Sequence, residues 1–344
     1  NAAIRAITKT AIAECRMSVV VFKDGYEGLV ERRFKELSYD DVSGIITWGG
    51  TILGTSNKAD PFHYRTGSAR GAAPLDLSDQ AIENARRLGV QALICIGGDG
   101  TLSIAHRFWK KGLPCIGIAK TIDNDLGGTE VTFGFDSALT TAAEAIDKIR
   151  TTAESHHRVM VVEVMGRYAG WIALCTGLAG GGDIVLIPEI PYRMDVICDF
   201  VKARHRKGRR FSIIVVSEGA RAVGGKQVVD RVIGDSPDPV RLGGVGKVIA
   251  NEIERRTRIE SRVTVLGHLQ RGGEPTVFDR ILATRFGEEA VRLARVGRFG
   301  RMVGIKGGEI VSVPFIKAIA KLKRVPKNSP LVRTARAVGT CFGV

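Results

Sequence analysis

The amino-acid sequence predicts an α/β protein made of two Rossmann-like lobes, each with three αβα layers around a mostly parallel sheet. Short apolar segments of strand length alternate with segments of helical periodicity as far as about Ile305, which is typical of parallel sheets covered by helices. Several apolar segments end in glycine-rich or charged turns, where α/β proteins place their ligands. A chain of 344 residues is long enough to bury two cores.

The first predicted element is a helix from Asn1 to about Glu14, with Asn1 as a suitable N-cap residue. A parallel α/β lobe normally begins with a strand before such a helix, so we expect that the chain lacks its true beginning. Residues 57–73 are polar and predict a loop with cationic side chains available for anions. The other expected elements are strands over 17–23, 92–96, 114–119, 158–164, 184–188, 211–216 and 263–266, and helices over 77–88, 101–110, 137–152, 196–206 and 245–256.

Composition limits the class of protein and its partners. The six cysteines are scattered without a CxxC pair, which predicts reduced thiols and a cytoplasmic location. The longest uncharged run, 168–182, is too short and too rich in glycine to span a bilayer, so no membrane partner is expected. The formal net charge is +15, but the basic residues are spread out and are not interleaved with aromatic residues. We therefore favour a solvated surface that attracts anionic substrates over a nucleic-acid-binding protein.

A glycine-rich turn follows the predicted strand 92–96. Gly98, Asp99, Gly100 and Thr101 belong to the sequence GGDGT, whose glycines let backbone amides approach phosphate oxygens. The N-terminus of the following helix adds positive potential, and Asp99 is a candidate Mg²⁺ ligand. The alternative is a tight strand-to-helix turn without a ligand.

An acidic turn, KTIDND, follows the predicted strand 114–119. Asp123 is placed to accept a proton from a substrate hydroxyl, and Asp125 to orient that hydroxyl or to assist the metal. Aspartates that only form a turn are the alternative, but the neighbouring Lys120 could neutralise phosphate charge. A phosphate-binding turn beside an acidic turn indicates phosphoryl transfer.

Charged side chains also gather at the ends of other predicted strands. Each alone is more often a surface charge, but together they indicate a sugar-phosphate site, with arginines on the phosphate and a carboxylate on the hydroxyls. The residues are Arg158, Arg167, Arg262, His268, Arg271 and Glu218. The chain has no GxxxxGK[ST], GxSxG or HExxH motif and no zinc-like cysteine spacing. A Walker-type NTPase, a serine hydrolase and a zinc protease are therefore disfavoured.

Together these motifs resemble the 6-phosphofructokinase family over almost the whole chain. The segments that carry the resemblance are NAAIR from Asn1, GGTILG from Gly49, IGGDGT from Ile96, KTIDND from Lys120, VVEVMGRYAGW from Val161, SEG from Ser217 and VLGHLQRGG from Val265. The resemblance implies an enzyme of glycolysis that phosphorylates the 1-hydroxyl of fructose 6-phosphate to give fructose 1,6-bisphosphate. It also implies a donor-binding lobe over 1–136 and about 270–318, and a fructose 6-phosphate lobe over 137–269 and about 319–344.

Position by position, the resemblance implies roles for individual residues. Asp123 corresponds to the general base, Thr121 to a sugar contact, Asp99 to the Mg²⁺ residue and Arg167 to the arginine that stabilises the transferring phosphoryl group. Further fructose 6-phosphate contacts correspond to Met165, Gly166, Glu218, His268 and Arg271, and two arginines that the family supplies from a neighbouring subunit correspond to Arg158 and Arg262. The resemblance therefore implies a homo-oligomer with shared active sites, a tetramer rather than a dimer.

Two positions bear on the phosphoryl donor. In this family, pyrophosphate-dependent enzymes typically carry Asp where this chain has Gly100 and Lys where it has Lys120, whereas the usual bacterial ATP-dependent enzymes carry Gly at both. A carboxylate at position 100 would repel the α-phosphate of a nucleotide, and Lys120 can neutralise either donor. We therefore expect ATP with Mg²⁺, bound around Gly98, Asp99, Gly100 and Thr101, and keep pyrophosphate as the alternative.

The chain departs from the family pattern at its beginning and in one loop. Only Asn1 remains of the family's first strand and GGDxPGxN loop, so a catalytically impaired binding subunit or a fragment is an alternative of another class. In the long loop after Gly54, Lys58 and Arg65 are both candidates for the family arginine that bridges donor and substrate. The resemblance also implies allosteric regulation, because basic residues occupy effector-site positions, although exposed surface charges would look the same. These residues are Arg5, Lys9, Arg150 and Arg209.

Overall fold

The computed structural model describes residues 1–56, 58–65, 73–232 and 240–344. Its strands are β1 (Val19–Phe22), β2 (Phe34–Leu37), β3 (Leu93–Gly97), β4 (Cys115–Ala119), β5 (Val159–Val164), β6 (Ile184–Leu186), β7 (Ser212–Ser217), β8 (Val229–Val232), β9 (Val240–Leu242), β10 (Ser261–Val265), β11 (Arg301–Lys306) and β12 (Glu309–Pro314). Its helices are α1 (Ala2–Ala13), α2 (Tyr26–Glu31), α3 (Ser78–Arg87), α4 (Asp99–Lys110), α5 (Phe135–His156), α6 (Trp171–Ala179), α7 (Met194–Arg206), α8 (Val245–Thr257), α9 (Val277–Arg295), α10 (Phe315–Ile319) and α11 (Pro330–Ala337), with 3-10 turns η1 (Ile45–Thr47) and η2 (Gly267–Arg271).

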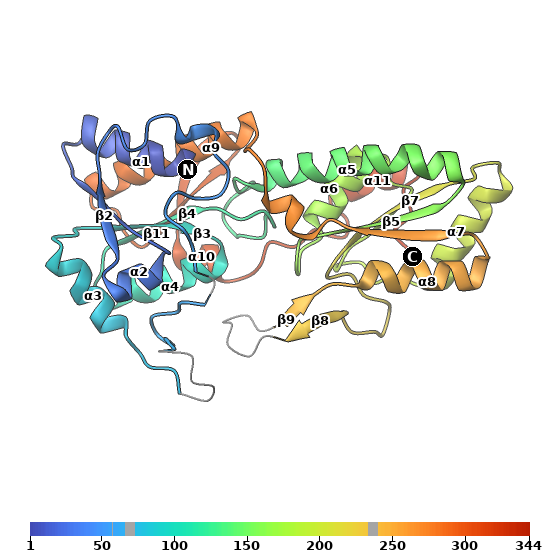
Figure 1. Ribbon diagram of the computed structural model, residues 1–344, viewed down its shortest axis with the longest axis horizontal. Coiled ribbons are helices and arrows are strands. Elements are labelled where there is room, and N and C mark those ends of the chain that lie inside the picture. Colours follow the sequence, from blue (N-terminus) through green and yellow to red (C-terminus); the bar gives the residue numbers. More distant parts are fainter. Residues whose placement is uncertain (57, 66–72, 233–239) are drawn as a thin grey trace.

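Two four-stranded sheets organise these elements. One has the order β12-β11-β4-β3, in which only β12 runs antiparallel to its neighbour. The other has the order β10-β5-β7-β6 and is parallel throughout. Figure 1 shows α1 and α9 on one face of the first sheet and α2, α3 and α4 on the other, and likewise α5, α6 and α11 against α7 and α8 around the second. The predicted α/β class with mostly parallel sheets is therefore confirmed.

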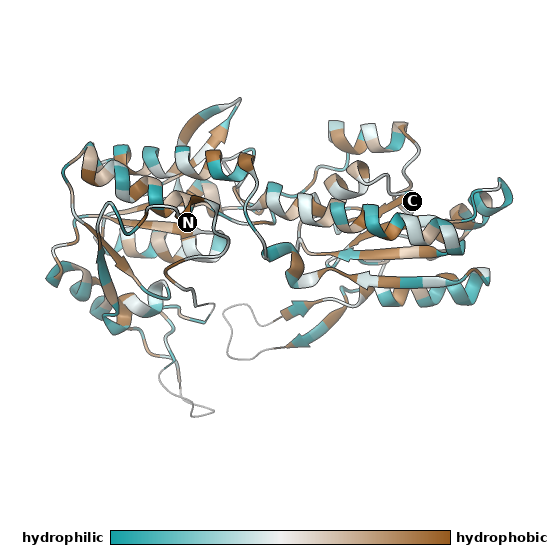
Figure 2. Ribbon diagram, turned by 45° about the horizontal axis from the view of Figure 1, so that its top comes forward, coloured by the Kyte–Doolittle hydropathy of each residue, from teal (hydrophilic) through white to brown (hydrophobic). Residues whose placement is uncertain are grey.

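We call each sheet with the helices that cover it a lobe. Fully buried side chains such as Phe108, Ile118 and Phe286 fill the first lobe, whereas Ile146 and Ile172 belong to the core of the second. Parallel strands that are buried on both faces read as continuous apolar segments, and in Figure 2 the strands are largely brown while teal gathers on the outer helices and loops. We predict that the boundaries between the lobes lie near residues 136, 270 and 318. The separate hydrophobic cores of the two lobes support this prediction.

Most of the predicted elements are present with ends shifted by a few residues. The strand expected over 17–23 is present as β1, but it pairs only with β2 in a separate antiparallel ribbon. A second ribbon joins β8 to β9. Of the loop expected over 57–73, residues 57 and 66–72 lie outside the described residues. All six cysteines are free thiols, and three of them are buried.

Among the described residues, no helix combines the length and the apolar character that crossing a membrane requires.

Candidate active site

The carboxyl ends of β3 and β4 bring the two predicted polar turns side by side. The register pairs Gly97 with Ala119 at the ends of these strands, and the backbone N of Lys120 donates to the carbonyl O of Gly97 at 3.1 Å. A Cβ added at Gly98 would lie 3.5 Å from the Cβ of Thr121, so the turns touch directly. This adjacency is the one that the sequence predicts.

The glycine-rich turn leads straight into α4, whose first residue is Asp99. Its N-cap residue, Gly98, has no side chain to accept from the first amide groups of the helix, which leaves them available to an anion. The side chain of Thr101 fills the space beside Gly97, where an added Cβ would lie 2.3 Å from its Oγ1. The local geometry therefore suits a phosphate group.

The acidic turn is buried. Asp123 is 8% exposed and Asp125 is 6% exposed. Burial raises the pKa of Asp123, which the positive charges of Arg271 and Arg167 lower in part and the negative charge of Asp99 raises further. Burial raises the pKa of Asp125 to about 7, and the neighbouring Asp123 and Asp99 contribute to that rise. A carboxylate with a raised pKa is a better general base near neutral pH.

Arg167 reaches this cluster from the second lobe, through the turn that follows β5. Gly166 has φ 135 and Arg167 has φ 53, so the turn contains two consecutive residues with positive φ. The backbone N of Arg167 donates to Oε1 of Glu218, at the end of β7, at 3.0 Å. A Cβ added at Gly219 would lie only 1.9 Å from the carbonyl O of Arg167, so the SEG sequence needs glycine at this position.

The segment after β10 completes the cluster. His268 and Arg271 are exposed on η2, and Arg271 lies close enough to Asp123 and Lys120 to lower the pKa of both groups. Burial is the larger cause of the lowered pKa of Lys120, although this residue has an exposed face at the mouth of the site. The side chain of Gln270 is buried, and its Oε1 accepts from the backbone N of Met165 at 2.8 Å. Four predicted segments thus lie around Asp123, namely those that carry Asp99, Arg167, Glu218 and Arg271.

The GGTILG turn of the first lobe contacts the segment that follows η2. A Cβ added at Gly49 would lie 2.0 Å from the carbonyl O of Gly273, so these two backbone segments are in contact. The side chain of Asn1 orders the same turn, because its Nδ2 donates to the carbonyl O atoms of Trp48 and Gly49 and its Oδ1 accepts from the N of Ile52.

Arg158 and Arg262 lie at the opposite end of the second sheet. They flank the amino ends of β5 and β10, and both pair with Glu260, Arg158 through Nε at 2.9 Å. Parallel strands separate their two ends by the full length of the strand, so these arginines do not reach Glu218 within one chain. This placement fits residues that serve a neighbouring subunit.

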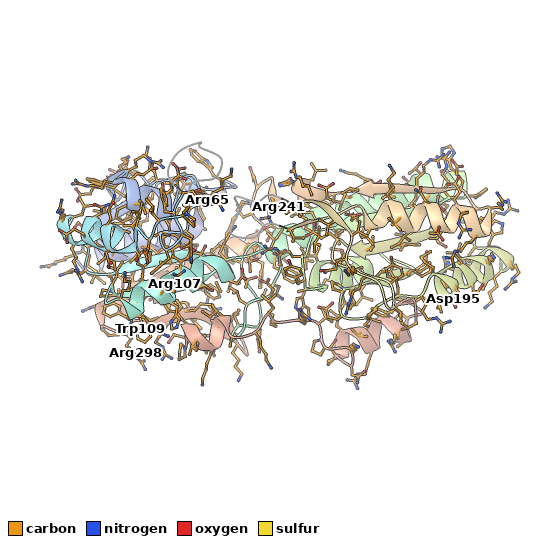
Figure 3. All side chains as sticks on the ribbon, turned by 90° about the horizontal axis from the view of Figure 1, so that it is seen from below. Arg65, Arg107, Trp109, Asp195, Arg241 and Arg298 are labelled. Atoms are coloured by element: carbon orange, nitrogen blue, oxygen red, sulfur yellow. The ribbon has the colours of Figure 1, made fainter. Side chains whose placement is uncertain are left out.

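Lys58 and Arg65 lie in the loop after Gly54, and their place at the donor site stays a prediction. Figure 3 shows Arg65 at the side of the first lobe that faces the second, and Arg241 near the middle of the molecule. Arg70, a third cationic residue of the loop expected over 57–73 to be available for anions, lies outside the described residues. Of the predicted effector positions, Arg150 donates to the carbonyl O of Gly181 at 2.8 Å and Lys9 lies over the ring of Tyr39.

Gln270 and Lys323 are functional candidates that sequence reasoning missed. Gln270 lies in the HLQRGG motif between His268 and Arg271, which was a usable signal. Lys323 is 199 residues away from Asn124, to which it donates, and no local motif marks it.

The raised pKa of Glu218 predicts a pH-dependent stability. Burial, followed by the charges of Asp123 and Glu163, raises the pKa of Glu218 from 4.5 to about 7. The folded chain therefore prefers the protonated carboxyl, and this contribution to stability is complete below about pH 4.5 and is lost as the pH rises through about 7. We expect the Glu218→Gln variant to gain up to about 3 kcal/mol of unfolding free energy relative to the parent between about pH 5 and about pH 8.

Urea denaturation at the two pH values measures this difference. The matched control is Glu309→Gln, which changes an exposed glutamate. A difference between Glu218→Gln and the parent that stays constant with pH would show that the carboxyl is not held in this way.

The fold and the site define an α/β protein whose buried carboxylates and converging cations suit phosphoryl transfer. A family model described as phosphofructokinase matches residues 1–294, and the chain belongs to this family. It is 48% identical over 344 residues to the ATP-dependent 6-phosphofructokinase 2 of Clostridium perfringens, covering 99% of this chain and 94% of that protein. It is also 48% identical over 326 residues to the pyrophosphate–fructose 6-phosphate 1-phosphotransferase of Streptomyces coelicolor, covering 94% of this chain and 92% of that protein.

Solved structures agree with the fold. The phosphofructokinase from Saccharomyces cerevisiae has a TM-score of 0.80 at 31% identity, and the match covers 93% of this chain but 43% of that longer chain. The pyrophosphate-dependent phosphofructokinase from Marinobacter aquaeolei has a TM-score of 0.78, covers 96% of this chain and 83% of that chain, and at 22% identity supports the fold alone.

Proposed function

We propose that the protein transfers the γ-phosphoryl group of ATP to the 1-hydroxyl of fructose 6-phosphate and forms fructose 1,6-bisphosphate. One observation carries the proposal: the buried Asp123 interacts electrostatically with Asp99 and Lys120 of the first lobe, with Arg167 of the second lobe and with Arg271 of the segment after β10. Relatives across nearly the whole length of the chain bear the name ATP-dependent 6-phosphofructokinase. The chemistry of the site and these names therefore point to the same reaction.

In this proposal Asp123 accepts the proton of the sugar hydroxyl as its oxygen attacks the γ-phosphorus, and ADP leaves. Arg167 stabilises the charge on the transferring group from the second lobe. Glu218 and Thr121 bind the sugar, as do Met165 and Gly166. Arg271 and His268 hold its phosphate.

The first lobe holds the donor in the same proposal. The first amide groups of α4 and Lys120 bind phosphate oxygens, and Gly98, Gly100 and Thr101 line the turn. Asp99 and Asp125 would hold Mg²⁺, which supplies positive charge to the phosphates. The fit is supported by the oxygen-only donor set and by the closeness of carboxylates, since burial first, and then the charges of Asp123 and Asp99, raise the pKa of Asp125. Within the described residues no three His, Cys, Asp or Glu side chains form a metal cluster.

Pyrophosphate is the second candidate donor, since a relative named for it is as similar as those named for ATP. Gly100 supports ATP, because it is exposed and an added Cβ would meet no atom within 4 Å. This space is open for the α-phosphate of a nucleotide. The donor is tested with purified protein, fructose 6-phosphate, Mg²⁺ and each donor in turn. Turnover with pyrophosphate and none with ATP would overturn the choice, and turnover with neither would support the binding-only subunit.

The Gly100→Asp variant should lose activity with ATP by about 100-fold or more in kcat/KM, a loss of about 3 kcal/mol. The new carboxylate fits sterically but repels the α-phosphate, whereas activity with pyrophosphate, which has no such group, should fall less. Gly100→Ala is the matched control, because it adds the Cβ without the charge. Equal losses in both variants would show that charge at this position does not govern the donor.

We also propose a homo-oligomer, a tetramer rather than a dimer, in which Arg158 and Arg262 serve the site of a neighbouring subunit. Their position at the far end of the second sheet supports this arrangement. A cytoplasmic location and allosteric control through Arg5, Lys9, Arg150 and Arg209 belong to the same proposal, the former supported by the free cysteines.

A further inference from the structure

A lysine from the C-terminal part of the chain reaches the acidic turn. The Nζ of Lys323 donates to Oδ1 of Asn124 at 2.7 Å and to the carbonyl O atoms of Thr129 and Glu130 at 3.1 and 2.8 Å. These three acceptors match the three protons of an ammonium group. The backbone N of Lys323 also donates to the carbonyl O of Asp125 at 2.6 Å. Lys323 therefore holds this turn through both its side chain and its backbone.

Asn124 is the residue through which this contact reaches the two carboxylates. It lies between Asp123 and Asp125, is 4% exposed and has φ 51, a left-handed conformation that asparagine adopts more readily than most residues with a side chain. Its Oδ1 accepts from the backbone N of Thr132 at 3.2 Å as well as from Lys323. Both hydrogen bonds hold the side chain of Asn124 in place in the buried turn. The orientation of both neighbouring peptide groups, and hence of both carboxylates, depends on these contacts.

The same segment is bound to the second lobe. The indole Nε1 of Trp171, the first residue of α6, donates to the carbonyl O of Lys323 at 2.7 Å. Trp171 follows Arg167 by four residues. The hydrogen bond therefore ties Lys323 to the chain just after the turn that carries Arg167.

A buried glutamate adds a second contact to the second lobe. The Oε1 of Glu189 accepts from the backbone N of Val325 at 2.9 Å and from that of Gly170 at 3.0 Å. The residues Lys323–Val325, which we call the crossing segment, are therefore hydrogen-bonded to the acidic turn on one side and, on the other, to Trp171 and Glu189, which hold the chain just after the turn that carries Arg167.

We propose that Lys323 is a positioning residue for phosphoryl transfer, which fixes Asp123 relative to Arg167 by holding Asn124 on one side and Trp171 on the other. The inference rests on the proposed function. Lys323 touches neither reacting group, and it acts through the geometry of the acidic turn. Since a displacement of about 1 Å can cost about 100-fold in rate, loss of this contact should act on kcat rather than on substrate affinity.

The first test compares Lys323→Met with Lys321→Met, an exposed lysine two residues earlier in the chain. Steady-state kinetics with ATP and fructose 6-phosphate should show kcat lowered by about 10- to 100-fold in Lys323→Met, with both KM values within a few-fold of the parent. Lys321→Met should match the parent. If Lys323 only stabilised the fold, Lys323→Met would lower the thermal unfolding midpoint and the fraction of folded enzyme. The kcat of each folded molecule would then equal that of the parent.

The second test is a double-mutant cycle with Asn124→Gly. Glycine adopts the left-handed conformation without strain, so this variant removes the side-chain acceptor and leaves the backbone free to keep its shape. If Lys323 acts through Asn124, the double variant should lose no more kcat than the more impaired single variant. If the double variant instead lost kcat by the product of the two single losses, Lys323 would not act through Asn124.

Outcomes for the inference and for the proposed function are distinct. An active parent with Lys323→Met indistinguishable from Lys321→Met overturns the inference alone, whereas a parent without phosphotransferase activity overturns both. Should Lys323→Met fail to fold, Trp171→Phe takes its place, because it removes only the donor to the Lys323 carbonyl and keeps an aromatic ring. It should lower kcat several-fold at unchanged KM, and unchanged kcat would overturn the inference.

Discussion

Replacing Asp123 with asparagine should lower kcat by about 10²- to 10⁴-fold, the range that a general base contributes. Asparagine is nearly the same size and cannot accept the hydroxyl proton, so the loss falls on the chemical step. Burial and Asp99 raise the pKa of Asp123 towards the working pH, which suits a base. The KM for fructose 6-phosphate should stay within a few-fold of the parent, because in the proposed function Arg271 and His268, not Asp123, hold the phosphate of the sugar.

The control for this variant is Asp195→Asn, which changes an exposed aspartate on α7 that pairs with Arg193. Figure 3 shows Asp195 at the far end of the second lobe, away from the space between the lobes. Stopped assays at saturating substrate give kcat, and binding of fructose 6-phosphate is measured directly by calorimetry. If Asp123→Asn kept turnover within a few-fold of the parent, Asp123 would not be the base.

The Gly219→Ala variant should lower kcat by about 100-fold without touching a reacting group. Its Cβ would lie 1.9 Å from the carbonyl O of Arg167, and an ordinary contact requires a shift of the backbone by more than 1 Å. Displacing Arg167 by this distance is enough for the loss. The variant should also unfold at lower denaturant concentration, since overpacking typically costs about 1–3 kcal/mol.

Gly225→Ala is the matched control for this variant. A Cβ at Gly225 would lie 3.4 Å from the nearest atom, the carbonyl O of Ala222, which is an ordinary contact. Urea denaturation measures the change in stability separately, so that kcat is compared at conditions where both variants are folded. Parent-like kcat in folded Gly219→Ala would mean that the position of Arg167 is less restricted than its contacts indicate.

Much of the fold follows from local sequence because the central strands are buried on both faces. Apolar segments such as 114–119 and 159–162 are typical of the strands of a parallel sheet, and charged turns follow these strands. The adjacency of Asp99 and Asp123 followed from this rule alone.

Other features depend on contacts that no local pattern records. The pairing of β1 with β2 forms a ribbon separate from the two main sheets, and the contact of Lys323 with Asn124 joins segments 199 residues apart. Gln270 was overlooked because a glutamine in a polar turn is usually exposed, whereas here its Oε1 binds the backbone N of Met165. Arg158 and Arg262 stand at the starts of predicted strands and Arg167 follows the end of one, and because β5 and β10 run parallel the first two lie at the opposite end of the second sheet from Arg167.

The packing of α1 on α9 has a consequence for synthesis on the ribosome. A Cβ added at Gly287 would lie 2.8 Å from the carbonyl O of Ala3, so the first helix of the chain is in close contact with one made nearly 300 residues later. The second sheet needs only residues 159–265, whereas the first sheet needs strands up to residue 314. The middle of the nascent chain can therefore fold first. The apolar face of α1 therefore stays exposed on the nascent chain until α9 has been synthesised. During this period chaperones can bind that face.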